Sequence, residues 1–455
     1  MTSAPDAAPA PLDPPNAAAD AASDAMVVRT ELADRALFNG AVTSRPLAFA
    51  ECADEAAVVA ALGTAADLGL CVAALAGGHD VSGRAFVEDN LVLDLRRIRD
   101  VRVDPAASEV TFGGGALTGD VLAALPDGLV TATGTVLSVG MTGLALGGGY
   151  GRLVNRLGLA ADCMRSARVV LADGSVVLAS EREDAELFWA LRGGGSGFGI
   201  VTSMTMALHA LPRVLGATVL YPLDRAEDTL LRAQATLDSH PFDLSLFMGF
   251  VTAPTGEAML FVAPMWSGDP ATGEALIESL TALDGALVLE RGWCRYRDTL
   301  SEESEKAWPK GRRYHLPTRT LGRLDETAVE MLVDAARRMT SPHSAIVLHD
   351  FHGAAAQVPP DATAFALRED HFVVEIIAAW DSDPGGGSRH RRWADELSAE
   401  LAIIAIPGGY VNLLAPAESE RVRRFYGLSA QRLADVKRRV DPNDMFRSGI
   451  GRLVD

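Results

Sequence analysis

The chain has few cysteines, fewer basic than acidic residues and no long apolar run. Its four cysteines lie far apart, with neither a CxxC pair nor a zinc-type spacing, so a reduced compartment is the simpler interpretation. Lysine and arginine number 41 against 60 aspartates and glutamates, a formal net charge of -19. Binding to a phosphate backbone requires clustered positive charge, and a membrane helix requires about 18–20 apolar residues in a row. We therefore expect neither a nucleic-acid nor a membrane partner.

The N-terminal segment lacks the parts of a secretory signal. Residues 1–24 are rich in alanine, proline and aspartate and contain no lysine or arginine. A secretory signal needs a basic start and a continuous apolar core, and this segment has neither. We expect residues 1–27 to form a disordered leader and the protein to be cytoplasmic.

Several nucleotide and metal fingerprints are also missing. No strict G-x-G-x-x-G follows a strand pattern and no G-x-x-x-x-G-K-[ST] occurs, which removes most support for a nicotinamide or ATP site. HExxH is absent too. His349 and His352 form a close pair, but a metal site usually needs a third ligand and supporting hydrogen bonds. We interpret the pair as two histidines of a strand or turn and expect no metal.

What the chain does have is three glycine clusters. They are Gly77-Gly78 followed by His79, then Gly147–Gly151, interrupted only by Tyr150, and then Gly193–Gly195. Without Cβ atoms, such segments let the backbone approach a flat or anionic group closely. The clusters predict a buried cofactor that contains a pyrophosphate, with His79 as a candidate for holding it.

The 455 residues predict two domains, because one hydrophobic core usually serves fewer. Up to about residue 211, helical spacing alternates with short strand patterns and glycine turns. Beyond it, longer alternating segments predict an antiparallel sheet with helices on its back. In the first part we expect helices over 56–68 and 185–191, and strands over 70–75, 91–95, 101–103, 109–112, 167–171 and 176–179. In the second part we expect strands over 258–264 and 372–380, helices over 326–338 and 388–401, and a helical tail over 418–446.

The order of the motifs resembles one known family. Gly77-Gly78-His79-Asp80 is followed by Val139-Gly140-Met141-Thr142-Gly143, by Asp184-x-Glu186-Leu187-Phe188-Trp189-Ala190-Leu191-Arg192-Gly193-Gly194-Gly195, and by Gly409-Tyr410-Val411-Asn412. Each motif alone is weak, but their order and spacing are specific. From about Val28 onward the chain resembles the berberine bridge enzyme-like flavoproteins of the vanillyl-alcohol oxidase superfamily.

The resemblance implies an α+β fold with FAD as the cofactor. A two-subdomain FAD-binding domain of the PCMH type would span residues 28–211 and recruit residues 416–455, and a substrate-binding domain with a helix-covered antiparallel sheet would span 212–415. His79 occupies the position of the histidine that the family bonds covalently to the flavin 8α-methyl carbon. Val136 stands where many relatives have a second, cysteine tether, so the resemblance implies a single covalent tether.

The resemblance also implies which residues contact FAD and how oxygen reacts. Val139 matches the position whose size gates oxygen access in the family, and valine there favours an oxidase over a dehydrogenase. Besides His79, the implied cofactor-binding residues are Ala76, Gly77, Gly78, Asp80, Gly83, Val139, Gly140, Thr142, Gly143, Gly147, Gly148, Gly149, Gly151, Leu153, Ile200, Val201, Tyr410 and Asn412.

On the substrate side, Glu375 lies in the middle of an apolar strand pattern. A carboxylate there is costly unless it faces a polar site, and burial raises the pKa of a carboxyl toward the range of a useful general base. Glu375 also matches the family's base position. The alternative is a structural glutamate paired with an arginine. Tyr410 is the second catalytic candidate, as base or positioning donor supported by Asn412, and Tyr314 would line the substrate pocket.

The chain departs from the family pattern in places. Leu75 replaces an arginine that commonly precedes the glycine–histidine motif, Asp444 replaces an asparagine, and residues 447–451 replace a common Asn-x-Asn-Ile ending. These changes bear on the packing at the flavin edge more than on the chemistry.

The expected reaction transfers a hydride from a small-molecule alcohol, lactol, amine or phenolic to flavin N5 and then to molecular oxygen, giving hydrogen peroxide. An intermediate of secondary metabolism is one candidate substrate. Two alternatives stay open: a dehydrogenase with another acceptor, and a non-redox flavin-binding protein. The oligomeric state is left open.

Overall fold

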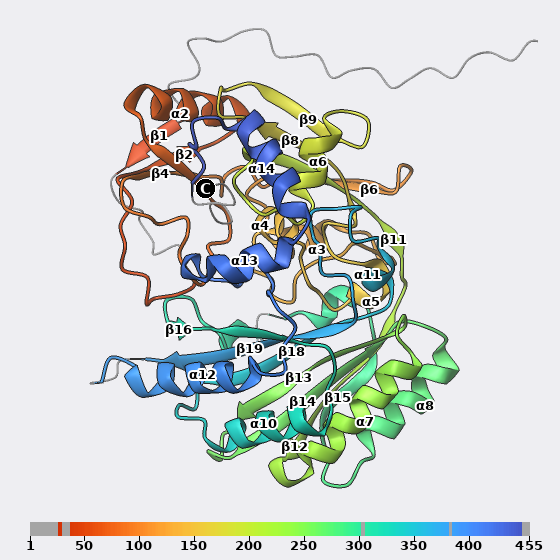
Figure 1. The fold of residues 1–455 in the computed structure, drawn as a ribbon. Helices are drawn as coiled ribbons and strands as arrows, with labels where there is room; N and C mark the ends of the chain where they lie inside the picture. Colours follow the sequence, from red (N-terminus) through yellow and green to blue (C-terminus); the bar gives the residue numbers. More distant parts are fainter. Residues whose placement is uncertain (1–25, 30–36, 302–304, 382–384, 448–455) are drawn as a thin grey trace, which may run out of the picture.

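The structure is a computed structural model that describes residues 26–29, 37–301, 305–381 and 385–447 (Figure 1). Its glycine-rich half contains two main sheets, and its other half contains one large sheet. The predicted α+β class is confirmed. None of the helices in these residues is long and apolar enough to span a membrane. All four cysteines are free thiols: Cys52, Cys71, Cys163 and Cys294.

The first sheet is small and mostly parallel. Helix α2 (Glu55–Leu68) covers it with a buried alanine- and valine-rich face. Asp54 caps the start of α2 by accepting a hydrogen bond from the Ala57 amide, and Gly69 ends the helix in the left-handed conformation. In spatial order the strands are β1 (Met26–Arg29), β2 (Ala48–Cys52), β4 (Asn90–Asp94) and β3 (Cys71–Leu75).

The second sheet is antiparallel and belongs to the same half. Its β8–β9 hairpin turns at Asp173-Gly174, as predicted, where the Leu171 amide donates to the Ser175 carbonyl. In spatial order its strands are β5 (Val101–Asp104), β6 (Glu109–Gly113), β10 (Ile200–Ala207), β8 (Met164–Val170) and β9 (Val176–Ser180). The remaining elements of this half are α3 (Thr118–Ala124), α4 (Met141–Leu146), α5 (Val154–Leu157), α6 (Ala185–Leu191) and a two-stranded pair, β7 (Leu129–Val130) with β11 (His209–Ala210).

The second half is an eight-stranded antiparallel sheet whose outer face is covered by helices, as predicted (Figure 1). Its strands are β15 (Leu287–Cys294), β12 (Val214–Pro222), β14 (Ala258–Trp266), β13 (Leu244–Thr252), β18 (Ala345–Phe351), β19 (His371–Trp380) and β16 (Arg313–His315), with β17 (Thr318–Leu321) also paired to β19. The covering helices are α7 (Ala226–Ser239), α8 (Pro270–Thr281), α10 (Glu326–Arg337) and α12 (Ser388–Leu401).

Strand alternation decides which side chains face the helices and which face the other half. Leu348, Val374 and Ile376 belong to the core beneath the helices. Because neighbouring residues of a strand point to opposite faces, Glu375 between the last two points toward the glycine-rich half.

The C-terminal segment returns to the glycine-rich half. Helices α13 (Ser419–Tyr426) and α14 (Ser429–Val440), blue in Figure 1, lie against that half. The Tyr426 hydroxyl donates to the Gly193 carbonyl at 3.1 Å. Earlier residues already contribute to the same core, among them Phe365 and Tyr410. The assigned substrate domain, residues 212–415, therefore supplies part of that core as well.

At the other end of the chain, Met26 and Val27, assigned to the leader, are the first residues of β1 and pair with Cys52 and Glu51. Residues 1–25 of the predicted leader, and residues 448–451 of the departing C-terminal ending, lie outside the described residues.

Candidate active site

A cavity of about 400 Å³ lies between the two halves, within the size range of small-molecule sites. One wall comes from the glycine loop after β3 and from the segment that leads into α4. The opposite wall comes from the open face of the large sheet, and the C-terminal segment closes one side with Tyr410 and Asn412.

The glycine loop after β3 lies very close to the segment before α4. A Cβ atom on Gly77 would lie 2.6 Å from the Ser138 carbonyl oxygen, so only glycine allows this approach. Gly78 has a φ of 72°, in the left-handed region that glycine enters without strain. Lys310 from the second half donates to the Gly77 carbonyl at 3.2 Å. The loop is thus fixed from both sides.

His79 is held at the cavity wall by two contacts. Its Nε2 lies 2.9 Å from Ser138 Oγ, and its ring stacks on Phe38 at 4.8 Å. Burial, with a smaller contribution from the positive charge of Lys310, lowers the pKa of His79 to about 4. The imidazole is therefore neutral at physiological pH, and Nδ1 has no partner among the described residues.

The opposite wall brings together Glu375 and a histidine from the neighbouring strand. Glu375 Oε1 lies 3.2 Å from His349 Nε2, and the two side chains are 19% and 14% exposed. Val347 is the direct cross-strand partner of Glu375, so His349, two residues further, shares its face. The partner of Glu375 is thus a histidine and not the arginine of the structural alternative.

Tyr410 is fully buried between the two walls. Its hydroxyl oxygen accepts hydrogen bonds from the Gly149 amide at 3.2 Å and from Asn412 Nδ2 at 2.9 Å. Burial raises the pKa of Tyr410 to about 12, and the charge of Glu375 acts in the same direction. Tyr410 is therefore a phenol at neutral pH, and its proton is free to be donated into the cavity.

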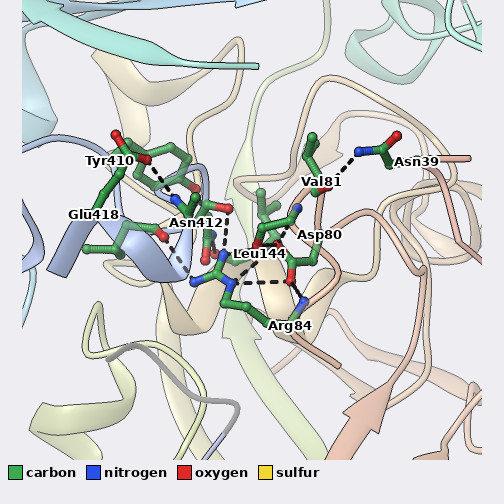
Figure 2. Close-up of polar contacts among 11 residues, drawn as sticks. Asn39, Asp80, Val81, Arg84, Leu144, Tyr410, Asn412 and Glu418 are labelled. Atoms are coloured by element: carbon green, nitrogen blue, oxygen red, sulfur yellow. Dashed lines mark hydrogen bonds and ion pairs between the residues drawn. The ribbon is translucent and has the colours of Figure 1, made fainter. Parts of the chain in front are cut away.

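Asn412 and Arg84 connect the C-terminal segment to the glycine-rich half (Figure 2). Asn412 Nδ2 also donates to the Leu144 carbonyl at 3.0 Å. Arg84 forms an ion pair with Asp80 at 3.2 Å and donates to the Asn412 carbonyl at 2.9 Å. Asp80 lines the cavity, but its carboxylate is already ion-paired with Arg84.

The wall of the glycine-rich half fits FAD. Within the described part of the chain, the buried Thr142 hydroxyl at the cavity has no hydrogen-bond partner, and the amides of Gly78 and His79 have no protein acceptor. Such donors need acceptors from a ligand. The pyrophosphate and the isoalloxazine carbonyls of FAD supply acceptors, and the glycines of this wall let the backbone approach its flat ring closely.

Most of the implied cofactor residues line this cavity. They are Ala76, Gly77, Gly78, His79, Asp80, Gly83, Val139, Gly140, Thr142, Gly143, Ile200, Val201, Tyr410 and Asn412. Tyr314 also lines it, with its ring stacked on Phe38 at 4.4 Å and its hydroxyl donating to the Pro309 carbonyl.

Five of the implied cofactor residues are not among those that line this cavity, and their contact with FAD stays a prediction. Added Cβ atoms on the glycines would collide with protein: with Asn412 at Gly147, with Phe365 at Gly148, with Ala160 at Gly149 and with the Thr133 carbonyl at Gly151. Leu153 is 2% exposed in the hydrophobic core. The glycines of this cluster serve close packing, because neighbouring chain segments occupy the space of their missing side chains.

His349 lines the site, although the sequence patterns singled it out only as half of a histidine pair and gave it no role there. The structure separates it from His352, which is buried with its ring against Phe372 at 5.2 Å. Among the described residues, no group of three or more histidine, cysteine or acidic side chains could hold a metal. Strand alternation could have placed His349 on one face, but only the β18–β19 register places it beside Glu375.

The departures from the family pattern lie away from the catalytic groups. Leu75 is buried with Phe49 and Val92 behind the glycine loop. Asp444 adopts a φ of 53° and lies 3.4 Å from Lys437. Arg447 pairs with Asp444 at 3.4 Å.

Comparison with known families agrees with this geometry. Residues 46–180 match the model of an FAD binding domain, and residues 409–450 match the model described as berberine and berberine like. Fold and matches together define the class as an FAD-linked oxidoreductase.

The chain is similar over most of its length to enzymes of this class. It is 30% identical over 437 residues to the FAD-linked oxidoreductase aurO of Gibberella zeae, covering 92% of this chain and 83% of that protein. It is 29% identical to the (R)-6-hydroxynicotine oxidase of Paenarthrobacter nicotinovorans, covering 90% and 92%. The structure of 6-hydroxy-D-nicotine oxidase from Arthrobacter nicotinovorans superposes with a TM-score of 0.85 at 26% identity, covering 93% and 97%. The chain belongs to the berberine bridge enzyme-like FAD-linked oxidoreductases.

Proposed function

We propose that the protein is an oxidase that takes a hydride from a carbon of a small-molecule alcohol, lactol, amine or phenolic, passes the electrons to molecular oxygen and releases hydrogen peroxide. FAD is held by one covalent bond through His79. The observation that carries the proposal is the cavity itself, where a neutral histidine lies on one wall, Glu375 on the opposite wall and Tyr410 at the side between them.

Bound FAD supplies the hydride-accepting N5 atom and the electron carrier for oxygen. The rest of the reaction falls to residues of this chain. Glu375 is the group that can accept the substrate proton, at a carboxylate oxygen. Tyr410, a phenol at neutral pH, orients the reacting group by donating its proton, while Asn412 and the Gly149 amide fix its hydroxyl oxygen.

Separate observations support the covalent bond between His79 and FAD and the use of oxygen as the electron acceptor. His79 is neutral, with Nδ1 open, as a nucleophilic imidazole must be. Val136, in place of a cysteine, leaves His79 as the single tether. Val139 lines the cavity and has the side chain that the family resemblance associates with oxygen access. A similar protein is named a 6-hydroxynicotine oxidase, which supports an amine or phenolic substrate. The free cysteines support a cytoplasmic location, which belongs to the same proposal.

The tether is tested by acid precipitation of the purified yellow protein. We expect the flavin colour to stay with the precipitated wild type and to be lost from precipitated His79→Ala. Colour that is released from the wild type by acid contradicts the covalent bond.

The identity of the electron acceptor is tested by stopped-flow mixing of dithionite-reduced protein with oxygenated buffer. We expect rapid return of the oxidised flavin spectrum with one hydrogen peroxide per flavin. Slow reoxidation that becomes fast with a quinone identifies a dehydrogenase instead. A flavin that stays oxidised in anaerobic mixtures with every alcohol, amine and phenol tried, including (R)-6-hydroxynicotine, identifies a non-redox protein.

A further inference from the structure

Arg152 reaches the large sheet without meeting a carboxylate. It follows Gly151 in the glycine-rich half, and its Nη2 donates to the Ala263 carbonyl of β14 at 2.8 Å. A guanidinium carries five N–H groups, yet this is the one hydrogen bond that Arg152 makes within the described residues. Its Nε is buried and has no partner there. Most of the hydrogen-bonding capacity of this side chain is therefore unused.

Two acidic side chains influence Arg152, but neither pairs with it. Burial lowers the pKa of Arg152, and the charges of Asp350 and Glu290 oppose this from a distance. Asp350 Oδ2 accepts hydrogen bonds from a backbone amide and from Asn155 Nδ2, both at 2.9 Å, and Glu290 Oε1 accepts one from Thr218 at 2.8 Å. In the part of the chain that the structure describes, no carboxylate lies within 4.0 Å of an Arg152 nitrogen. Its charge thus has no ion-pair partner in the protein.

The guanidinium lies next to the sheet wall of the cavity. Its Cζ is 5.9 Å from the ring centroid of Phe247, which lines the cavity from β13. Ala263, which accepts the hydrogen bond from Arg152, is directly opposite Phe247 on β14. Tyr150, two residues before Arg152, also lines the cavity. Arg152 therefore lies at the end of the cavity where Phe247 and β14 meet the glycine-rich half.

This end of the cavity differs from the wall that fits FAD. The unpaired hydroxyl and amide donors that fit FAD belong to the glycine-rich wall, whereas Arg152 is bonded to the sheet. Phe247 and Glu375 lie on strands that are separated by β18 alone, so on the order of 10 Å separates them. An anionic group beside Phe247 is thus kept away from the Glu375 carboxylate.

We propose that this end of the cavity is a carboxylate subsite, in which Arg152 binds a carboxylate carried by the substrate. The planar fork of an arginine matches the two oxygens of a carboxylate. Such a group supplies both the missing negative charge and acceptors for the unused N–H groups. The inference rests on the proposed function and adds one charged group to its substrate class.

The test is equilibrium binding to the oxidised holoprotein at constant ionic strength, followed by the change in the flavin absorption spectrum. The probes are benzoate and benzamide, which have nearly the same shape and differ in charge. We expect wild type to bind benzoate at least about tenfold more tightly than benzamide, the value of one hydrogen bond to a charged group.

Substitutions at Arg152 then assign the preference to this side chain. Arg152→Met removes the charge from a long side chain, so benzoate and benzamide should bind within about threefold of each other. Arg152→Lys keeps a positive charge without the planar fork and should show an intermediate preference. Arg156→Met is the matched control, because Arg156 is 36% exposed and pairs with Asp243 at 3.0 Å. It should keep the wild-type preference.

Two results overturn the inference: wild type that binds benzamide as tightly as benzoate, or Arg152→Met that keeps the preference for benzoate. If Arg152→Met holds no flavin, Arg152→Gln takes its place with the same expectation. Binding needs no turnover. An active oxidase without the preference therefore contradicts the subsite alone, and slow reoxidation of a protein with the preference contradicts the oxidase proposal alone.

Discussion

A single contact prepares His79 for its role at the flavin. Ser138 Oγ can accept a hydrogen bond from the Nε2–H group of the neutral imidazole, which leaves the ring's lone pair on Nδ1. The Ser138 backbone is fixed separately, because its amide donates to Glu305 Oε1 at 2.7 Å. A change of the Ser138 side chain therefore alters the hydrogen bonding of the His79 imidazole and leaves the Ser138 backbone held by Glu305.

We predict that Ser138→Ala lowers the fraction of covalently bound flavin. Without the hydroxyl, the imidazole loses its only side-chain hydrogen bond among the described residues, and less of it presents Nδ1. Ser138→Thr keeps the hydroxyl and should keep the tether. The measurement compares the flavin that stays with acid-precipitated protein to the total flavin. An unchanged covalent fraction in Ser138→Ala would show that Phe38 stacking alone orients the ring.

Glu375 is the second residue whose role can be isolated. We predict that Glu375→Gln slows flavin reduction by about 10²–10⁴-fold, because the amide keeps the shape but cannot accept a proton. The measurement is the anaerobic bleaching rate with saturating substrate. Glu330→Gln, on the exposed side of α10, is the control and should reduce at the wild-type rate. If Glu375→Gln reduces its flavin at a rate within threefold of wild type, roughly the scatter of surface variants, another group must be the general base.

At the scale of elements, local signals predicted the helices and strands well. The Asp54 and Gly69 caps bound α2, and alternation outlined β14 and β19. The role of Gly147–Gly151 was not predictable in the same way. Whether a glycine faces a ligand or another backbone depends on partners far along the chain, here Asn412 and Phe365. The Glu375–His349 pair likewise depends on the β18–β19 register and not on either strand alone.

The segment between β18 and β19 is another long-range feature, because it leaves the large sheet and packs on the glycine-rich half. Arg368 in this segment forms a bidentate pair with Asp162, both bonds at 2.8 Å, with side chains 2% and 9% exposed. Phe365 donates its amide to the Arg192 carbonyl nearby. These contacts join the two halves beside the cavity.

We predict that Arg368→Met destabilises the protein by about 3–5 kcal/mol, because Asp162 keeps a buried charge without its partner. The double variant with Asp162→Asn should recover part of this loss. Arg423→Met is the control, since Arg423 and Glu420 are 54% and 61% exposed and such pairs are worth less than about 1 kcal/mol. Urea unfolding measures all three. Equal losses at Arg368 and Arg423 would contradict a structural role for the buried pair.

On the scale of the whole molecule, the site exists only because distant segments meet. Arg84 contacts the Asn412 backbone across 328 residues of sequence, and Asn39 contacts the Tyr314 backbone across 275. The family motifs predicted most residues of the glycine-rich cavity wall. The arrangement of the substrate-facing wall depends on how the two halves pack together, which the motifs do not specify. Stability of the whole is therefore coupled to groups buried where the halves meet.

Buried histidines make that stability depend on pH. His371 Nε2 lies 2.5 Å from the Tyr150 hydroxyl, and burial lowers the pKa of His371 to about 3, as it lowers the pKa of His79 to about 4. In the unfolded chain a histidine has a pKa of about 6.5. Between these values the unfolded state binds more protons than the folded state. The free energy of unfolding is therefore highest above about pH 6.5 and falls as the pH drops below it.

We predict that the titration of His371 lowers the free energy of unfolding by about 2 kcal/mol between pH 7 and pH 5, measured by urea unfolding at each pH. His371→Gln removes this group while its amide can still bond Tyr150, so its loss over the same range should be about 2 kcal/mol smaller than that of wild type. The difference between the two proteins cancels the carboxylates, which titrate in both. An identical pH dependence in His371→Gln would mean that His371 is already protonated in the folded protein, which would reverse the hydrogen bond to Tyr150 and make the tyrosine oxygen its acceptor.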